Sequence, residues 1–208
     1  MKDTVRQGFI VFEGIDGAGT TTQSRLLHER LLSAGCASVL TSEPTTRAVG
    51  LVIRRVLAGE IPAAPETVAY LFAADRSDHL SAPDGMLAHL AAGELVVCDR
   101  YKYSSLAYQT VEADPDLVAD LNSRFPDPRI VFFLDLATDA AEARLSGRPS
   151  REIYERLEFQ EQVRSRYLSV FEQVPAEVGV VRLDASLPQD VIAEKVWESL
   201  VSTSIVET

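Results

Sequence analysis

The sequence predicts a three-layer α/β fold in which a five-stranded parallel sheet is flanked by helices. Short, nearly continuous apolar runs alternate with amphipathic stretches, a pattern typical of parallel sheets covered on both faces. The length of 208 residues, with 46% hydrophobic and 25% charged residues, fits one globular domain over 1–208. A glycine-rich loop follows the first apolar run, so ligand binding is expected at the carboxyl edge of the sheet.

Five apolar runs predict the strands of this sheet. The first run, GFIVFE, directly precedes the glycine-rich loop, and the other four are separated from it and from one another by stretches with helical spacing. The expected strands cover residues 8–13, 37–41, 94–98, 129–136 and 178–183.

Helices are expected where apolar residues recur three or four positions apart. The first, from 20 to about 34, carries Leu26, Leu27, Leu31 and Leu32 on one face and ends before Gly35. Further helices are expected over 49–57, 66–80, 83–92 and 188–200, with one starting at 140–145 and a long one from 154 to about 173.

Composition excludes several classes of protein. The net charge of −11 disfavours a nucleic-acid partner. Cys36 and Cys98 are far apart and outside any C-x-x-C, which disfavours disulfide frameworks and structural zinc. No apolar run approaches the roughly 18 residues of a membrane span, and the N-terminus lacks a signal sequence, so a soluble cytoplasmic protein is expected. Seventeen of the twenty basic residues are arginines, so phosphate binding must depend mainly on guanidinium groups.

The segment 14–22 (GIDGAGTTT) indicates a phosphate-binding loop. Its glycines let backbone N–H groups surround phosphate oxygens, and the following helix directs its positive end at them. The pattern G-x-x-x-x-G-K-[ST] matches except that Thr20 replaces the lysine, while Thr21 keeps the hydroxyl that holds Mg²⁺. The alternative is a tight turn between strand and helix.

Asp99 and Arg100 follow the third strand. A carboxylate at the end of a strand beside a phosphate loop suits a water-linked Mg²⁺ ligand, and the arginine suits a second phosphate. The alternative is a salt pair at the end of the strand. Tyr101, Ser105 and Tyr108 share one side if the stretch beyond is helical, which suits a nucleobase or sugar, although an aromatic stripe is more often core.

Phe72 and Arg76 are four residues apart on an expected helix and therefore share a face. A ring that stacks on a base and a cation that binds its edge would use this spacing. The alternative is a core phenylalanine beside a surface arginine.

The segment from about 144 to 156 contains Gly147, Pro149 and several arginines, among them Arg148 and Arg151. In an acidic chain, this cluster is expected to form a lid that covers phosphates and excludes water, and it is a natural substitute for the missing lysine. The alternative is an exposed, solvated helix.

Together these motifs resemble the thymidylate kinase family from residue 8 to residue 200. The segments that carry the resemblance are FEGIDGAGTTTQ (12–23), SEP (42–44), LFAADR (71–76), DRYKYSSLAYQ (99–109) and IYERLEFQ (153–160). The resemblance implies a P-loop NTPase fold, a homodimer, and transfer of the γ-phosphoryl group of ATP to dTMP with Mg²⁺, giving dTDP and ADP.

The resemblance also implies roles for individual residues. The residues expected at ATP are Gly14, Asp16, Gly17, Ala18, Gly19, Thr20, Thr21, Thr22, Arg144, Asp184 and Ala185. Those expected at dTMP are Asp16, Glu43, Pro44, Phe72, Arg76, Arg100, Ser104, Ser105, Tyr108 and Gln109. Thr21 and Asp99 are expected at the metal, and the catalytic residues are expected to be Arg148, Arg151, Asp16 and Arg100.

Two departures from the family pattern leave alternatives open. Thr20 lacks the charge of the usual lysine, so a weak or inactive nucleotide-binding homologue is one alternative. A kinase for another pyrimidine nucleotide or a deoxynucleoside is another. Ser42 stands where many bacterial members have arginine, and either Arg47 or Arg54 could replace that cation.

Overall fold

A five-stranded parallel sheet lies at the centre of the protein, in the order β2-β3-β1-β4-β5. The computed structural model describes residues 7–146 and 157–206. The strands are β1 (Phe9–Gly14), β2 (Ser38–Ser42), β3 (Leu95–Asp99), β4 (Ile130–Asp135) and β5 (Gly179–Asp184). The α/β fold expected from the sequence is therefore confirmed.

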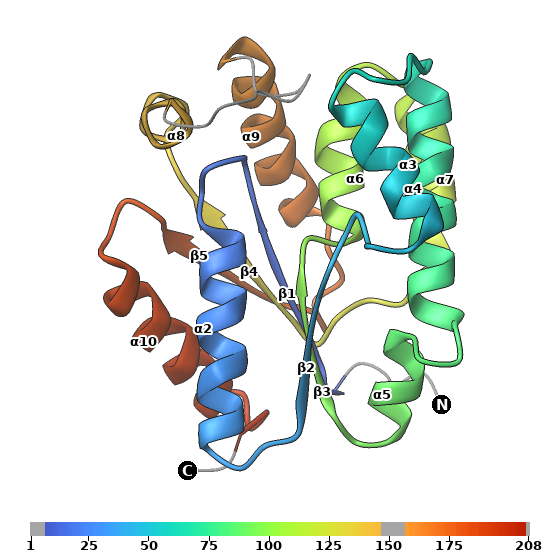
Figure 1. Ribbon diagram of the computed structural model, residues 1–208. Coiled ribbons are helices and arrows are strands. Elements are labelled where there is room, and N and C mark those ends of the chain that lie inside the picture. The colour runs from blue at the N-terminus through green and yellow to red at the C-terminus, as the bar shows by residue number, and fades with distance from the viewer. Residues whose placement is uncertain (1–6, 147–156, 207–208) are drawn as a thin grey trace.

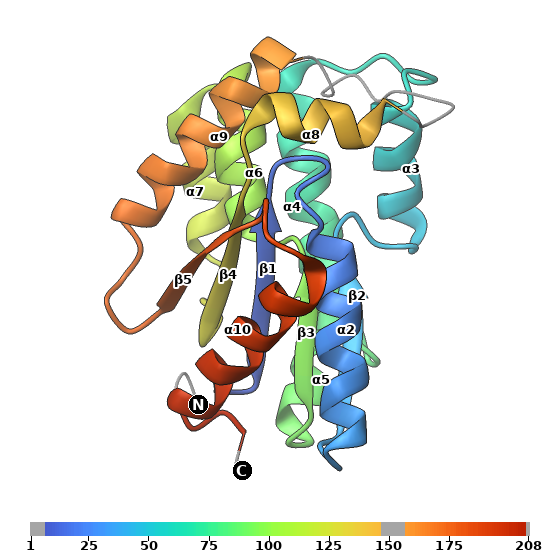
Figure 2. The ribbon, with the colours of Figure 1, turned by 90° about the vertical axis from the view of Figure 1, so that its left-hand side faces the viewer.

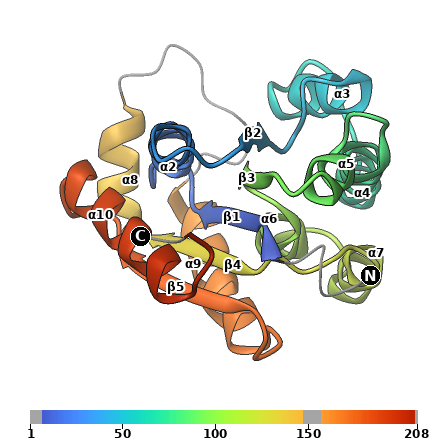
Figure 3. The same ribbon diagram turned by 90° about the horizontal axis from the view of Figure 1, so that it is seen from below.

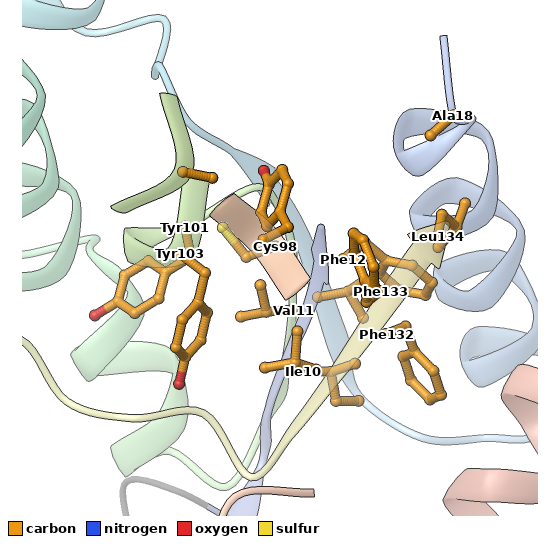
Figure 4. Packing of buried hydrophobic residues seen from close by; sticks show 14 of the residues in the cluster. Ile10, Val11, Phe12, Ala18, Cys98, Tyr101, Tyr103, Phe132, Phe133 and Leu134 are labelled. Carbon is orange, nitrogen blue, oxygen red and sulfur yellow. The ribbon is translucent and has the colours of Figure 1, made fainter. Parts of the chain in front are cut away.

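Burial of the strands follows their place in the sheet. The central β1 is buried along its whole length, whereas the edge strands β2 and β5 are largely half-buried or exposed. Two layers of helices cover a central strand, so its side chains are buried on both faces and are mostly apolar. Figure 4 shows this packing around Phe12 and Phe132, whose rings stack with centroids 5.1 Å apart.

The helices form one layer on each face of the sheet. Helices α2 and α10 cover one face, whereas α4, α5, α6, α7 and α9 lie on the other (Figures 1 and 3). The helices on the first face are α2 (Thr20–Ser33) and α10 (Gln189–Ser202). The remaining helices in the described residues, whichever side they lie on, are α3 (Ala48–Leu57), α4 (Pro65–Ser81), α5 (Met86–Ala91), α6 (Lys102–Tyr108), the short 3-10 helix η1 (Gln109–Val111), α7 (Pro115–Ser123), α8 (Thr138–Leu145) and α9 (Leu157–Glu172).

Two helices differ from the expectation. The helix expected over 83–92 begins only at Met86, because Gly85 has an extended backbone (φ −83°, ψ 173°) and forms the N-cap. Helix α7 was not expected, although Asp114 and Pro115 form a regular start: the Asp114 side chain accepts from the Asp116 amide, and proline occupies the first turn.

The sheet register brings the expected functional segments to one edge. Phe12 pairs with Asp99 and Ser42 also pairs with Asp99, so the chain leaves β1, β2 and β3 at the same level. Most buried apolar residues form one cluster. That residues 1–208 form a single domain stays a prediction. Across 7–146 and 157–206, no helix has the length and apolar character needed to cross a membrane.

Candidate functional site

A cavity of about 700 Å³ opens at the carboxyl edge of the sheet. Its walls come from the loop after β1, the turn after β2, α4, the segment after β3, and the ends of α8 and β5. The expected site residues that line it are Asp16, Gly17, Ala18, Gly19, Thr20, Thr21, Thr22, Glu43, Pro44, Phe72, Arg76, Asp99, Arg100, Ser104, Tyr108, Gln109, Arg144 and Ala185.

The loop between β1 and α2 has the shape of a phosphate cradle. A Cβ on Gly14 would lie 2.8 Å from the Leu134 carbonyl oxygen, so only glycine fits where the loop leaves the sheet. Gly19 adopts φ +100° immediately before α2. The first backbone N–H groups of α2 therefore point to the cavity, where they can bind an anion.

Thr20 is the first residue of α2 and is 5% exposed. It lines the cavity where the loop pattern expects lysine. Lys102 does not replace it, since its Nζ contacts the Phe125 carbonyl at 3.0 Å and Asp127 at 2.6 Å. Within the described part of the chain, the basic residues that line the cavity are all arginines, at positions 54, 76, 100 and 144.

Thr21 and Asp99 contact each other where the phosphate loop borders the cavity. The Thr21 hydroxyl donates to Asp99 Oδ2 at 2.5 Å. The other oxygen, Oδ1, is buried and has no hydrogen-bond partner in the described residues. A carboxylate oxygen left open beside a hydroxyl at a phosphate loop fits Mg²⁺, which favours oxygen ligands and retains water. Among the described residues, Arg100 forms its ion pair with Asp16, while Asp99 accepts from Thr21, so the expected alternative of a salt pair between Asp99 and Arg100 is not formed.

Arg100 is held in an unusual backbone conformation, with φ +68°. Its Nη2 lies 2.6 Å from Asp16 Oδ1, and its Nη1 donates to the Gly14 carbonyl at 2.8 Å. Gln160 on α9 donates to the other Asp16 oxygen at 2.9 Å. Asp16 therefore connects the phosphate loop to both Arg100 and α9.

A buried polar cluster fixes Arg76, which is 1% exposed. Its Nε donates to Glu43 at 2.8 Å, its Nη2 donates to the Ser105 hydroxyl at 3.0 Å, and its Nη1 donates to Asn122. The alternative of a surface arginine beside a core phenylalanine is therefore wrong. Every nitrogen of this guanidinium has a protein partner, so its orientation toward the cavity is set before any ligand arrives.

Glu43 in turn depends on His79. The Nδ1 of His79 lies 3.1 Å from Glu43 Oε1, and its Nε2 lies 2.6 Å from the Thr41 hydroxyl. A carboxylate only accepts hydrogen bonds, so Nδ1 carries a hydrogen. The peptide bond between Glu43 and Pro44 is cis.

Aromatic and amide groups complete the wall around Arg76. Phe72 lies one turn before Arg76 on α4, and the Tyr108 ring lies beneath the Arg100 guanidinium at 5.2 Å. Burial raises the pKa of the Tyr108 phenol. The Gln109 Oε1 atom is buried and has no partner in the described residues, so it remains available to a donor.

The structure distinguishes Arg54 from Arg47. Arg54 on α3 lines the cavity and donates to the carbonyls of Pro44 and Thr45. Arg47 pairs with Asp84 and Asp78 outside this cavity. Of the two arginines, Arg54 therefore lines the same cavity as Ser42, and Arg47 does not.

Comparison with known proteins agrees with this geometry. The family model described as thymidylate kinase matches residues 12–196. The chain belongs to the thymidylate kinase family. A relative named for this activity from Treponema pallidum (strain Nichols) is 38% identical over 201 residues, covering 94% of this chain and 96% of the relative. Relatives so named from Aeropyrum pernix and Thermococcus onnurineus are 39% and 41% identical, covering 92% and 86% of this chain and 96% and 91% of the relatives.

A few residues expected from the thymidylate kinase resemblance lie elsewhere. Ser105 contacts Arg76 behind the cavity wall, and Gly14 forms the base of the loop. Asp184 accepts hydrogen bonds from Ser186 outside the cavity. Arg148 and Arg151 lie outside the described residues.

Arg144 lines the cavity beside the phosphate loop. Its guanidinium donates to the Gly17 carbonyl at 3.3 Å and to the Ala185 carbonyl at 2.8 Å, so it joins the phosphate loop to the turn after β5. Figure 2 shows α8 passing above the loop between β1 and α2.

Sequence reasoning missed Asn122, His79 and Gln160. Asn122 lies on the unexpected α7, His79 is one turn beyond the LFAADR motif, and Gln160 is in a motif whose individual residues received no role. Of these three, only His79 had a signal in the sequence. Its spacing of i+3 from Arg76 puts it on the helix face of Phe72 and Arg76.

Proposed function

We propose that this protein transfers the γ-phosphoryl group of ATP to dTMP, giving dTDP and ADP, with Mg²⁺ as the metal. The observation that carries the proposal is that the phosphate loop, the Thr21–Asp99 pair and the Arg76 cluster all open into one cavity. A phosphoryl donor and a nucleotide acceptor can therefore be brought together with their phosphates adjacent, which is the main requirement of this reaction.

On the donor side, the backbone amides of residues 17–22 bind the ATP phosphates. Thr21 and Asp99 hold Mg²⁺, partly through water, and the metal supplies positive charge against the phosphate oxygens. Arg144, which already bridges the carbonyls of Gly17 and Ala185, lies where the rest of the nucleotide would extend.

On the acceptor side, Arg100 and Arg54 bind the phosphate of dTMP. Phe72 stacks on the thymine, and Tyr108 lies under the deoxyribose. The open Gln109 Oε1 accepts the N3–H of the base, and the prepositioned Arg76 donates to its carbonyl edge. A base that cannot donate to Gln109 Oε1 would leave this buried acceptor unpaired, which disfavours that base.

The lid arginines, Arg148 and Arg151, complete the proposal. A transition-state arginine is worth roughly 10³–10⁵ in rate in phosphoryl transfer, which is enough to offset one absent lysine. Asp16 holds Arg100, and this contact supports its assignment to the acceptor side.

The neutral Thr20 favours one competing function, nucleotide binding without turnover. Formation of dTDP from dTMP, ATP and Mg²⁺, followed by chromatography, distinguishes the two. We expect turnover by the wild-type protein and its loss in Asp99→Asn and Arg151→Ala. Tight dTMP binding with no dTDP would overturn the kinase proposal.

Specificity is tested by competition. With dTMP, dUMP, UMP and dCMP at equal concentration, we expect dTDP to be the main product. A predominance of any other diphosphate would support a kinase for a different pyrimidine nucleotide.

We also propose a homodimer, which is supported by exposed apolar side chains on α3 and α4. Leu51 is 51% exposed and Tyr70 is 54% exposed. Light scattering on a sizing column should give twice the monomer mass, and Leu51→Glu should reduce it to the monomer mass. A cytoplasmic location stays a prediction.

A further inference from the structure

Glu13 is a fully buried carboxyl group that the proposed reaction does not use. It lies in β1 directly before Gly14, is 0% exposed and does not line the cavity. A buried carboxylate is costly unless several donors satisfy it. The reason for its presence must therefore be sought in what it holds.

The carboxylate accepts hydrogen bonds from the segment that follows β3. Its Oε1 accepts from the backbone amides of Tyr101 at 2.9 Å and Ser104 at 3.2 Å. Its Oε2 accepts from the Ser104 hydroxyl at 2.5 Å and from the Tyr167 hydroxyl on α9 at 2.9 Å.

These contacts surround Arg100, the residue at φ +68°. Such a backbone is unfavourable for a residue with a side chain and persists only where its surroundings enforce it. The Arg100 amide donates to the Phe12 carbonyl at 2.9 Å, and the next amide, that of Tyr101, donates to Glu13. Strand β1 thus holds the peptide groups on both sides of the Arg100 Cα.

The same carboxylate also reaches the Arg100 side chain through two hydroxyls. The Arg100 Nη1 atom lies 3.4 Å from the Ser104 hydroxyl and 3.5 Å from the Tyr167 hydroxyl, both of which donate to Glu13 Oε2. Glu13 therefore contacts the backbone around Arg100 directly and its guanidinium through two hydroxyls, while Asp16 and the Gly14 carbonyl hold the guanidinium from the other side.

We propose that Glu13 is the positioning residue for the acceptor phosphate, because it holds the Arg100 backbone and guanidinium in the orientation that binds dTMP. This inference rests on the proposed function. It depends on the reach of the two carboxylate oxygens to the amides and hydroxyls. It does not make Glu13 a catalytic residue, since the side chain does not face the cavity.

Two variants of Glu13 distinguish the effect of side-chain length from the effect of the negative charge. Glu13→Gln keeps an oxygen for the amides of Tyr101 and Ser104, and its NH₂ group can donate to the hydroxyls. Glu13→Asp keeps the charge but withdraws the carboxylate by about 1.5 Å, the length of one C–C bond, which takes it beyond hydrogen-bond range.

We expect Glu13→Asp to raise the KM for dTMP by roughly 10- to 100-fold, the effect of losing a charge-assisted contact to the phosphate, with the KM for ATP within about twofold. Glu13→Gln should restore the KM for dTMP to within about threefold of wild type. A Glu13→Gln variant as impaired as Glu13→Asp, or a Glu13→Asp variant with an unchanged KM for dTMP, would overturn the inference.

A double-mutant cycle with Arg100→Ala tests whether Glu13 acts through Arg100. The effects should not add: Glu13→Asp in the Arg100→Ala background should change the KM for dTMP by less than about twofold. Additive losses would show that Glu13 only supports the fold, and would overturn the proposal.

Two further arms keep the test decisive. If circular dichroism shows that Glu13→Asp does not fold, Tyr167→Phe is used in its place. Tyr167→Phe should raise the KM for dTMP two- to fivefold when Arg100 is present, and it should have no such effect in the Arg100→Ala background. An equal rise in both backgrounds overturns the inference. If the wild type forms no dTDP, the same proteins are compared by calorimetric Kd for dTMP. In that case the proposed function fails, and the Kd values for dTMP still test the inference about Glu13. A wild-type protein that does not bind dTMP overturns both the proposed function and the inference.

Discussion

The Thr21 hydroxyl donates a 2.5 Å hydrogen bond to Oδ2 of Asp99, across 78 positions of the chain. This contact joins the first turn of the helix behind the phosphate loop to the end of β3. It uses one oxygen of the carboxylate, and Oδ1 has no hydrogen-bond partner among residues 7–146 and 157–206. The pair therefore has the form of a prepared oxygen site at the centre of the proposed reaction.

Replacing Asp99 should impair the response to Mg²⁺. Asn retains the size of the side chain but removes its charge, and loss of a group that orients metal ligands costs about 10- to 100-fold in metal affinity or activity. In Asp99→Asn, the Mg²⁺ concentration for half-maximal dTDP formation should rise by at least about tenfold. Asp120→Asn, on the surface of α7, serves as the matched control and should leave the Mg²⁺ curve unchanged. An Mg²⁺ curve equal to that of wild type in Asp99→Asn would contradict the assignment.

Replacing Thr20 with the lysine that the phosphate-loop pattern expects should strengthen the binding of ATP. Thr20 borders the cavity, so the Thr20→Lys side chain can extend into it. A new charge-assisted hydrogen bond to phosphate should lower the KM for ATP by roughly tenfold. Steady-state kinetics with varied ATP measure this effect, and Thr20→Val, which adds no charge, should show no gain. An unchanged KM for ATP in Thr20→Lys would show that another cation already occupies this role.

Disturbing the support of Arg76 should weaken binding of the base. Asn122→Leu removes the acceptor that holds Arg76 Nη1 and leaves a buried donor unpaired. The KM for dTMP should rise roughly tenfold while the KM for ATP is unchanged. Asn122→Asp keeps an acceptor oxygen and should be much less affected. Equal effects of the two substitutions on the KM for dTMP would argue against this hydrogen bond as the cause.

The stability of the protein should depend on pH through Glu13. Burial raises the pKa of this carboxyl from 4.5 to about 7, although hydrogen bonds from Ser104 and Tyr167 act in the opposite direction. Between these two values the folded state binds more protons than the unfolded state, so the free energy of unfolding falls as the pH rises. The full loss is about 3 kcal/mol.

Urea denaturation from pH 4.5 to 8 measures that loss. In Glu13→Gln, which has no proton to release, the decline in the free energy of unfolding should be smaller by about the same amount. Parallel curves for the wild type and Glu13→Gln would show that Glu13 ionises in the folded protein as it does in the unfolded chain.

Much of the architecture could be predicted from the sequence. Apolar runs such as 8–13 and 129–136 are nearly continuous, which is typical of strands in a parallel sheet covered on both faces. The loop after β1 could also be predicted, because Gly14, Gly17 and Gly19 follow the first run within six residues. The end of β3 was expected at the loop because parallel strands share a carboxyl edge.

The partners of the site residues were decided only by the tertiary structure. The sequence left Arg47 and Arg54 equivalent, and they separate because Asp84 and Asp78 engage one of them while the other reaches the cavity. Likewise, the motif LFAADR indicates Arg76 but not Asn122, which comes from a helix 46 positions away.

The sequence by itself determined the sheet, the phosphate loop and the family of this protein, because these depend on local patterns of apolar residues and glycines. Only the tertiary structure decided which buried groups orient the binding residues. Glu13 and Arg100, or Thr21 and Asp99, come together because β1 and β3 are neighbours in the sheet. Such pairing depends on long-range packing, for which no local spacing in the chain gives a signal.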